Sequence, residues 1–350
     1  MRCIRRPEAR IAFRQHERSL LMNVQSSENA RTQRRQFLTQ LSALAALGAC
    51  SPARSADAPP AAAAAGPLPG ISLGSYRISR LIAGWNPIGG HSYQGPHMDQ
   101  HMREYFTPEK AAEFLLDCER AGMNTHQFSP GEKAEAMLRL AREQGCKMNF
   151  ICLHSGREGI QAMVERTAPM AMAHHGGVTD RLFSEGKQSV VRDYLKAVHD
   201  SGLLAGMSAH NPDCIQRAAD EDWEADFFMT CFYFVTRKMF PGHTDPETLE
   251  IAAYPFYRDD PQVMTRVVRQ VKQPCLGYKI LGGGRMCRTQ ETVREAFRFA
   301  FANIKPSDAV IVGMYPRFFD EIGANAQYTS QLGSDRSHRV SSAERLGRTN

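Results

Sequence analysis

Four histidines stand where short apolar runs of this sequence end, and they are the side chains best suited to chemistry: His126, His154, His174 and His210. In the clearest case, residues 169–173 are small or apolar, and the run stops at His174, His175 and two glycines. Neutral imidazoles can hold a divalent metal with an open position for water or substrate. They can also form a metal-free acid–base pair. We therefore expect these four histidines to be catalytic or metal-binding residues. The alternative is that each histidine has a purely structural role.

Other side chains are expected near the same strand ends. Lys279 is a candidate catalytic residue, as an electrophile or anion holder. His175 replaces His174 if the register shifts by one residue, because alternate residues of a strand face opposite sides. Asp180 and Glu132 are expected in loops and are weak candidates for ligands. Residues expected to contact a substrate are Trp85, Asn86, Tyr93, Tyr233 and Tyr315.

The apolar runs alternate with segments of helical periodicity, and this order predicts an α/β protein with a single (β/α)8 barrel. A short hairpin is expected before it, over residues 71–80. In such a barrel the carboxyl ends of the strands form the active-site face, so the four histidines are expected to converge there. The expected strands are 81–84, 123–127, 148–153, 169–173, 203–209, 226–232, 275–280 and 308–313.

The length of 350 residues accommodates one barrel with a leader and a tail. The expected division is an N-terminal extension and signal (1–58), an Ala- and Pro-rich tether (59–70), the barrel (71–328) and a polar tail (329–350). The net charge of +6 arises in the leader, because residues 1–56 contain ten Arg and three acidic residues. The remaining chain is therefore close to neutral, and no nucleic-acid partner is expected.

The leader resembles a twin-arginine export signal. Arg34-Arg35-Gln36-Phe37-Leu38 precedes a short Ala-rich apolar segment. Residues 47–50 resemble a lipobox whose Cys50 would be lipidated, while residues 56–58 offer an ordinary cleavage site. Met22 is an alternative start, and a cytoplasmic extension is the alternative to a signal. The expected partner is the twin-arginine machinery, the location is the periplasm or the cell envelope, and any membrane contact runs through the signal or a lipid.

Nine cysteines are present, and no Cys-x-x-Cys pair occurs. Their scatter over expected strands and helices favours free, buried thiols over a disulfide framework. The body also lacks an apolar run long enough for a transmembrane helix.

Four segments together resemble the aldo-keto reductase superfamily: residues 78–90, 201–212, 278–284 and 308–314. The resemblance implies the barrel fold over roughly residues 71–326. The family's catalytic Asp, Tyr, Lys and His correspond here to Gln127 or His126, no Tyr, His154 and His174. Only the histidine is retained, so carbonyl reduction by the family's route is not expected. Gly282, Gly283 and Gly284 could still let the backbone approach the pyrophosphate of a tightly bound NAD(P).

These observations lead to one principal hypothesis and two alternatives. The principal hypothesis is an exported barrel enzyme with histidine-based, metal-free or metal-assisted chemistry on a small carbohydrate-like or carbonyl substrate. Lyase, isomerase and hydrolase are favoured over NAD(P)-dependent oxidoreductase. The alternatives are an oxidoreductase with tightly bound NAD(P) and a lipoprotein that binds a ligand without turnover.

Overall fold

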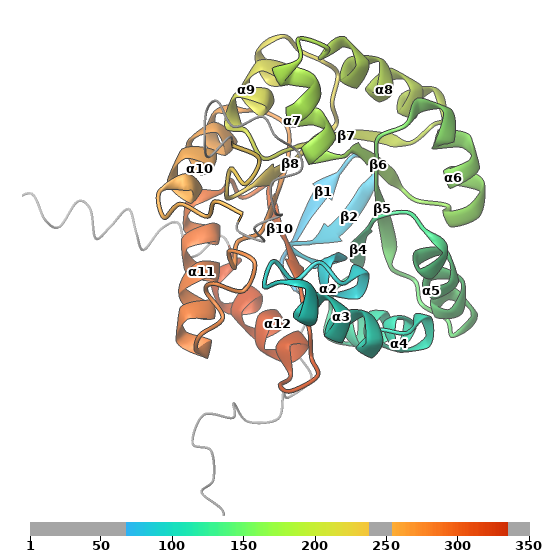
Figure 1. Cartoon of the computed structure of the whole chain (residues 1–350), viewed down its shortest axis with the longest axis vertical. Coiled ribbons are helices and arrows are strands. Elements are labelled where there is room, and N and C mark those ends of the chain that lie inside the picture. The colour runs from blue at the N-terminus through green and yellow to red at the C-terminus, as the bar shows by residue number, and fades with distance from the viewer. Residues whose placement is uncertain (1–67, 238–253, 335–350) are drawn as a thin grey trace, which may run out of the picture. The chain divides into compact units, whose positions relative to one another are not determined.

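A computed structural model describes residues 68–237 and 254–334. Eight parallel strands close into a barrel in the order β10-β3-β4-β5-β6-β7-β8-β9 (Figure 1), so the expected (β/α)8 fold is confirmed. The export signal, Cys50 and most of the tether lie outside the described residues. The strands are β3 (Leu81–Gly84), β4 (Thr125–Phe128), β5 (Asn149–His154), β6 (Ala171–His174), β7 (Leu204–Ala209), β8 (Phe227–Cys231), β9 (Cys275–Tyr278) and β10 (Ala309–Gly313).

Helices surround the barrel (Figure 1). Those expected from periodicity are α4 (Pro108–Arg120), α5 (Glu132–Glu143), α6 (Ile160–Thr167), α8 (Ser189–Asp200), α9 (Pro212–Asp220), α10 (Asp260–Gln270) and α11 (Gln290–Asn303). Four helices and one 3-10 turn were not expected: α2 (Asn86–Gly89), α3 (Pro96–Tyr105), η1 (Arg157–Gly159), α7 (Gly176–Ser184) and α12 (Glu321–Leu332). The last helix therefore extends past the expected domain boundary at residue 328.

Side chains alternate between two apolar clusters along the strands. One set fills the barrel interior and includes Ile151 and Ala173. The other set faces the helices and includes Phe150, Cys152 and Met172. Because a strand has a period of two, this division fixes the direction of every side chain at the strand ends.

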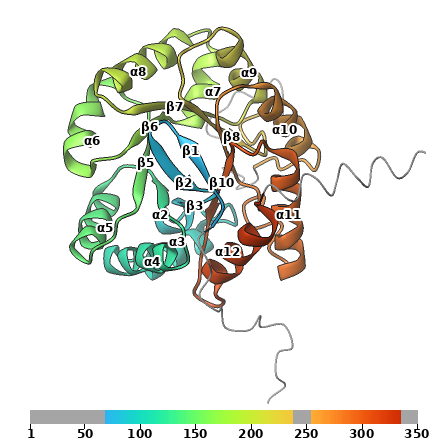
Figure 2. The same cartoon turned by 180° about the vertical axis from the view of Figure 1, so that it is seen from behind.

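The hairpin formed by β1 (Gly70–Leu73) and β2 (Tyr76–Ser79) lies across one end of the barrel (Figure 2). Its side chains Ile71, Leu73 and Ile78 belong to the interior cluster and are almost fully buried. The expected hairpin is thus confirmed, and it closes the end opposite the carboxyl ends of the strands.

The described cysteines are all free, and six of the seven are buried, which agrees with the expected free thiols. Within residues 68–237 and 254–334, no helix has the length and apolarity needed to cross a bilayer.

Replacing Leu73 by Ala tests the role of the hairpin in stability. Leu73 is 0% exposed at the floor of the barrel. The substitution should lower the free energy of unfolding by about 2–5 kcal/mol, because it removes buried methyl groups and leaves a cavity. Chemical denaturation measures the loss. Ser72→Ala, on the exposed face of the same strand, is the control and should change stability by less than about 0.5 kcal/mol.

Candidate active site

Three of the four expected histidines do not point into the barrel. His126, His154 and His174 share the parity of the helix-facing side chains. The ring of His126 packs 6.4 Å from Phe150, and the rings of His154 and His174 lie 6.3 and 5.0 Å from Tyr194 of α8. The expected convergence of four imidazoles was therefore wrong, because the strand register turns these three outward.

The outward-facing histidines are largely enclosed. Nδ1 of His126 lies 2.9 Å from the carbonyl oxygen of Ala83, and Nδ1 of His174 lies 2.7 Å from the hydroxyl of Thr179. Burial lowers the pKa of each imidazole to about 4. Both rings are thus neutral at physiological pH and act as part of the packing between barrel and helices.

Among the described residues, no group of three or more His, Cys, Asp or Glu side chains is arranged to hold a metal ion. The expected metal ligands His126, His154, His174 and His210 are accordingly not assembled into one site.

Gln127 and His175, which follow His126 and His174 along the chain, have the parity of the interior side chains. Ser208, His210 and Tyr278 share this inward parity on β7 and β9. The hydroxyl groups of Ser208 and Tyr278 lie 3.1 Å apart, and the ring of His210 lies 5.7 Å from that of Tyr278. His175 thus takes the place that was expected for His174, and His210 is the one histidine of the original four that keeps its expected direction.

Asp180 fixes the orientation of His210. One carboxylate oxygen lies 2.8 Å from His210 Nδ1 and also accepts a 2.8 Å hydrogen bond from Thr236. The other oxygen accepts a hydrogen bond from the backbone N–H of Asn211, and the backbone N–H of His210 is shared between both oxygens. If Nδ1 carries the proton, as this contact favours, Nε2 is left as a proton acceptor.

The sequence predicted Asp180 as a weak ligand candidate in a loop, and its pairing with His210 was not expected. The segment after β6 forms α7, which begins at Gly176. The apolar spacing of Val178 and Leu182, four residues apart, was the available signal. Gly176 is required by close packing: a Cβ there would lie 2.9 Å from both Ser208 Oγ and the Tyr278 hydroxyl.

A cavity of about 430 Å³ opens at the carboxyl ends of the strands. Of the expected substrate-contacting residues, Trp85, Asn86, Tyr93 and Tyr315 line it. Tyr233 is absent from its lining and packs on Phe256, with ring centroids 5.1 Å apart. Tyr278, Gln127, His91 and the expected residue Lys279 also line the cavity. Its volume suits a small organic molecule.

Lys279 and Tyr93 are held in an uncommon backbone conformation. Their φ angles are 58° and 60°, in the left-handed region that non-glycine residues rarely occupy. The two residues meet, with the Lys279 ammonium 4.7 Å from the centre of the Tyr93 ring. Such strain is retained where the surrounding structure imposes it, and it is frequent at functional sites.

Lys279 dominates the electrostatics of the site. Burial lowers the pKa of Lys279, whereas the ionised forms of Tyr93 and Cys231 raise it, and the pKa lies overall above the ordinary value of a lysine. Burial lowers the pKa of His91, His175 and His210, and the positive charge of Lys279 lowers each further. For His210 these effects outweigh the hydrogen bond to Asp180, which acts in the opposite direction. Of these three imidazoles, His91 lines the larger cavity together with Lys279, whereas His175 and His210 lie near Lys279 but are not among the lining residues.

The glycine turn after β9 borders the same cavity. Gly282, Gly283 and Gly284 have φ angles of 58°, 58° and 87°, so the turn requires glycine. The carbonyl oxygen of Gly283 accepts a 2.6 Å hydrogen bond from Gln94. Among the described residues, the amides of Gly283 and Gly284 have no hydrogen-bond acceptor. These amides offer two hydrogen-bond donors to an anion. The segment after β10 contributes Tyr315 and Phe318 to the cavity lining, and it adds no basic side chain there that could bind a phosphate group.

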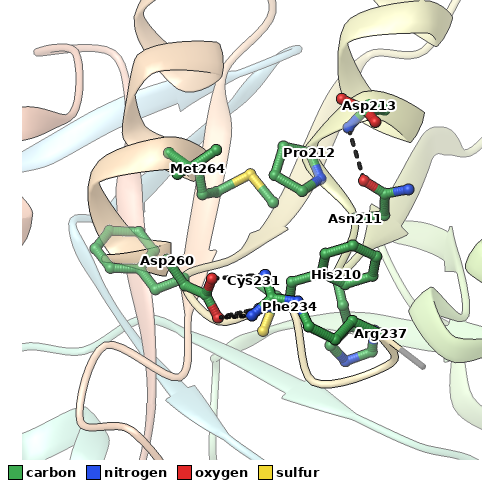
Figure 3. Close-up of a pocket in the computed structure, with 11 residues that line it drawn as sticks. His210, Asn211, Pro212, Asp213, Cys231, Phe234, Arg237, Asp260 and Met264 are labelled. Atoms are coloured by element: carbon green, nitrogen blue, oxygen red, sulfur yellow. Dashed lines mark hydrogen bonds and ion pairs between the residues drawn. The ribbon is translucent and has the colours of Figure 1, made fainter. Parts of the chain in front are cut away.

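His210 also lines a second, smaller cavity of about 160 Å³ between the loop before α9 and the start of α10. Figure 3 shows the charged pair in it: Asp260 accepts a 2.7 Å hydrogen bond from Arg237 and another from the backbone N–H of Phe234. Because this pair is internally neutralised, the larger cavity is the better candidate for a substrate site.

No family model matches the sequence, and no curated protein matches it. Solved structures resemble the fold. The aldo-keto reductase AKR11B4, a glycerol dehydrogenase from Gluconobacter oxydans, is 12% identical, with a TM-score of 0.48 over 79% of this chain and 94% of that chain. Gox0644 is 10% identical, with a TM-score of 0.48 over 78% and 96%.

A truncated 3-deoxy-D-arabino-heptulosonate 7-phosphate synthase from Thermotoga maritima is 16% identical, with a TM-score of 0.43 over 80% of this chain and 94% of that chain. The glycerol dehydrogenase and the synthase differ in activity from one another. At these identities the likeness concerns the fold alone, and the chemistry of this chain has to be argued from its own residues.

Replacing His126 by Asn tests the assignment of the outward histidines. The folded pKa of His126 is about 4 and lies below the unfolded value of 6.5. The unfolded chain therefore binds the proton more readily, and stability should fall as pH decreases from about 6.5 to 4, by up to about 3 kcal/mol for this group. In His126→Asn this part of the pH dependence should disappear. Denaturation at several pH values measures it, with the exposed His97→Asn as the control.

Proposed function

We propose that this chain is an enzyme that transfers protons on a small carbonyl compound of carbohydrate-like size. The observation that carries the proposal is the placement of Lys279. It lines the larger cavity in a strained conformation, remains positively charged, and lies close enough to His91, His175 and His210 to lower the pKa of all three. A fixed cation beside neutral bases is the arrangement needed to remove a proton next to a carbonyl group.

The steps follow from these groups. The Lys279 ammonium binds the carbonyl oxygen of the substrate and stabilises the negative charge that develops there as the neighbouring C–H bond breaks. A neutral imidazole accepts that proton. We assign this role to His175, because its buried Nδ1 has no hydrogen-bond partner within the described part of the chain. In an isomerisation, the proton returns to the former carbonyl carbon, and the proton of the neighbouring hydroxyl group moves to the former carbonyl oxygen. In an elimination, the β-substituent departs with its bonding electrons and takes up a proton from an imidazolium ion.

The Asp180–His210 pair supplies a second proton-transfer group. Asp180 holds the imidazole in one orientation and stabilises the imidazolium ion when the ring takes up a proton. Two bases with different surroundings allow one to remove a proton while the other, once protonated, donates to an oxygen.

Replacing Lys279 by Gly separates the function of this residue from its contribution to stability. Glycine adopts a φ of 58° without the cost of about 1 kcal/mol that an L side chain carries there. The variant should therefore remain folded with little loss of stability and yet lose at least about 100-fold in turnover. Ala168→Gly is the matched control, because Ala168 also has a positive φ (41°) but lies at the end of α6, outside the cavity lining.

The assay is incorporation of deuterium from D2O into a panel of aldoses, ketoses and 2-oxo acids, followed by NMR. His175→Gln should abolish incorporation, whereas His154→Gln, which alters an outward-facing histidine, should retain it. Equal rates in wild type and His175→Gln would contradict the proposed base. No incorporation into any member by wild type would leave the ligand-binding lipoprotein as the better hypothesis.

The redox hypothesis is a second candidate because the amides of Gly283 and Gly284 face no protein acceptor in the described residues. If an NAD(P) were bound, these amides and Lys279 would contact it, and the nicotinamide would supply hydride transfer. An absorbance scan and elemental analysis of protein purified without chelator distinguish the candidates. Bound nicotinamide favours the redox hypothesis, and about one equivalent of a transition metal favours metal-assisted chemistry.

We further propose export by the twin-arginine pathway, which rests on the leader sequence. Replacing Arg34 and Arg35 by Lys should leave the protein in the cytoplasmic fraction, because the arginine pair is the element recognised in such signals. Cell fractionation in a bacterial host measures the shift. Replacement of Arg5 and Arg6 by Lys, outside the motif, should leave export unchanged. Cys50→Ala should release the protein from the envelope only if this cysteine is lipidated.

A further inference from the structure

Two parts of the larger cavity's lining differ in chemistry. One wall, formed by the strand ends and the following turn, contributes Gln127 and Lys279 beside apolar residues such as Ile280. The second, apolar wall comes from α3 and from the segment between β10 and α12. It is apolar and aromatic, and consists of Met98, Met102, Tyr315 and Phe318.

Two side chains of the apolar wall are exposed in this structure. Phe318 is 77% exposed and Met98 is 36% exposed. Large apolar side chains left in water are common as isolated surface residues, but a pair on the wall of a concave cavity marks a place where a ligand covers apolar surface.

The Phe318 ring is held in place despite its exposure. It stacks on His101, with ring centroids 6.1 Å apart and planes inclined by 12°. It also makes an edge-to-face contact with the Tyr315 ring, with centroids 6.2 Å apart. His101 is fixed in turn by a 3.0 Å contact between its Nδ1 and the Tyr315 hydroxyl. A ring oriented in this way offers a prearranged flat surface to a ligand.

We infer that the ligand of this cavity is an oxyanion or carbonyl compound that carries a flat apolar group. The oxygen would bind at Lys279, and the flat group would lie against Phe318 and Met98. This inference rests on the proposed function for the role of Lys279, and it adds the part of the substrate that determines specificity. A small ligand is favoured over a protein partner because both exposed side chains line the same cavity as the cation.

Three probes test the inference with the full-length chain by isothermal titration calorimetry. 1-Naphthoate carries both features, acetate carries only the negative charge, and 1-naphthalenemethanol carries only the flat group. 1-Naphthoate should bind at least about tenfold more tightly than either of the others, because it alone engages both walls.

Two variants assign the contacts. Phe318→Ala should weaken 1-naphthoate binding by about fivefold and leave the affinity for acetate unchanged, because only the flat group loses its contact. Lys279→Met should weaken both anions and leave the neutral alcohol unaffected. Tyr76→Ala is the control, since Tyr76 is an exposed aromatic residue of the hairpin outside the cavity lining.

The outcomes separate this inference from the proposed function. If 1-naphthoate binds no more tightly than acetate, or if Phe318→Ala changes nothing, the apolar subsite is refuted while the proton-transfer role of Lys279 can still stand on the deuterium assay. If Lys279→Met leaves 1-naphthoate binding unchanged, the anion end of the inference is refuted. Equal weakening by Tyr76→Ala would show that the probe binds outside the cavity.

Discussion

The alternation of side chains along the parallel strands determines which groups share the lumen of this barrel. At the end of β6, His174 and His175 differ by a single position, yet one ring packs against Tyr194 of α8 and the other lies near Lys279. The same alternation places His126 beside Phe150 and leaves Gln127 on the wall of the cavity. Helix packing and chemistry thus use neighbouring residues of the same strands.

Few of the ionisable groups around the site carry a charge. Lys279 remains a cation, and its charge, together with burial, keeps His91, His175 and His210 neutral. Asp180 is surrounded by hydrogen-bond donors, so its carboxylate is directed at His210 and not at a ligand. A buried imidazole becomes positively charged when it takes up a proton, and burial disfavours that charge. Proton transfer from a bound molecule is therefore favourable only where neighbouring groups stabilise the charges that develop on the imidazole and on the molecule.

The sequence predicts the architecture well because each strand is a short apolar run and most helices have an apolar face of period 3.6. It predicts the site only in part. Lys279 and four of the five expected contact residues do line the cavity, since strand ends and the loops after them must meet at one face. The direction of each histidine could not be read reliably, because a buried strand is apolar on both sides and leaves the register undefined. The pairing of Asp180 with His210 was not expected for a different reason: α7 is only nine residues long and begins with two glycines, which weaken the helical signal.

The hairpin at the amino-terminal end of the strands restricts how a ligand enters and leaves the barrel. Its side chains Ile71, Leu73 and Ile78 fill the interior at that end, so the barrel is closed there. A molecule that reaches Lys279 must arrive and depart by the same opening, past the rim formed by α3 and Phe318. A reaction product therefore leaves through the opening by which the substrate entered.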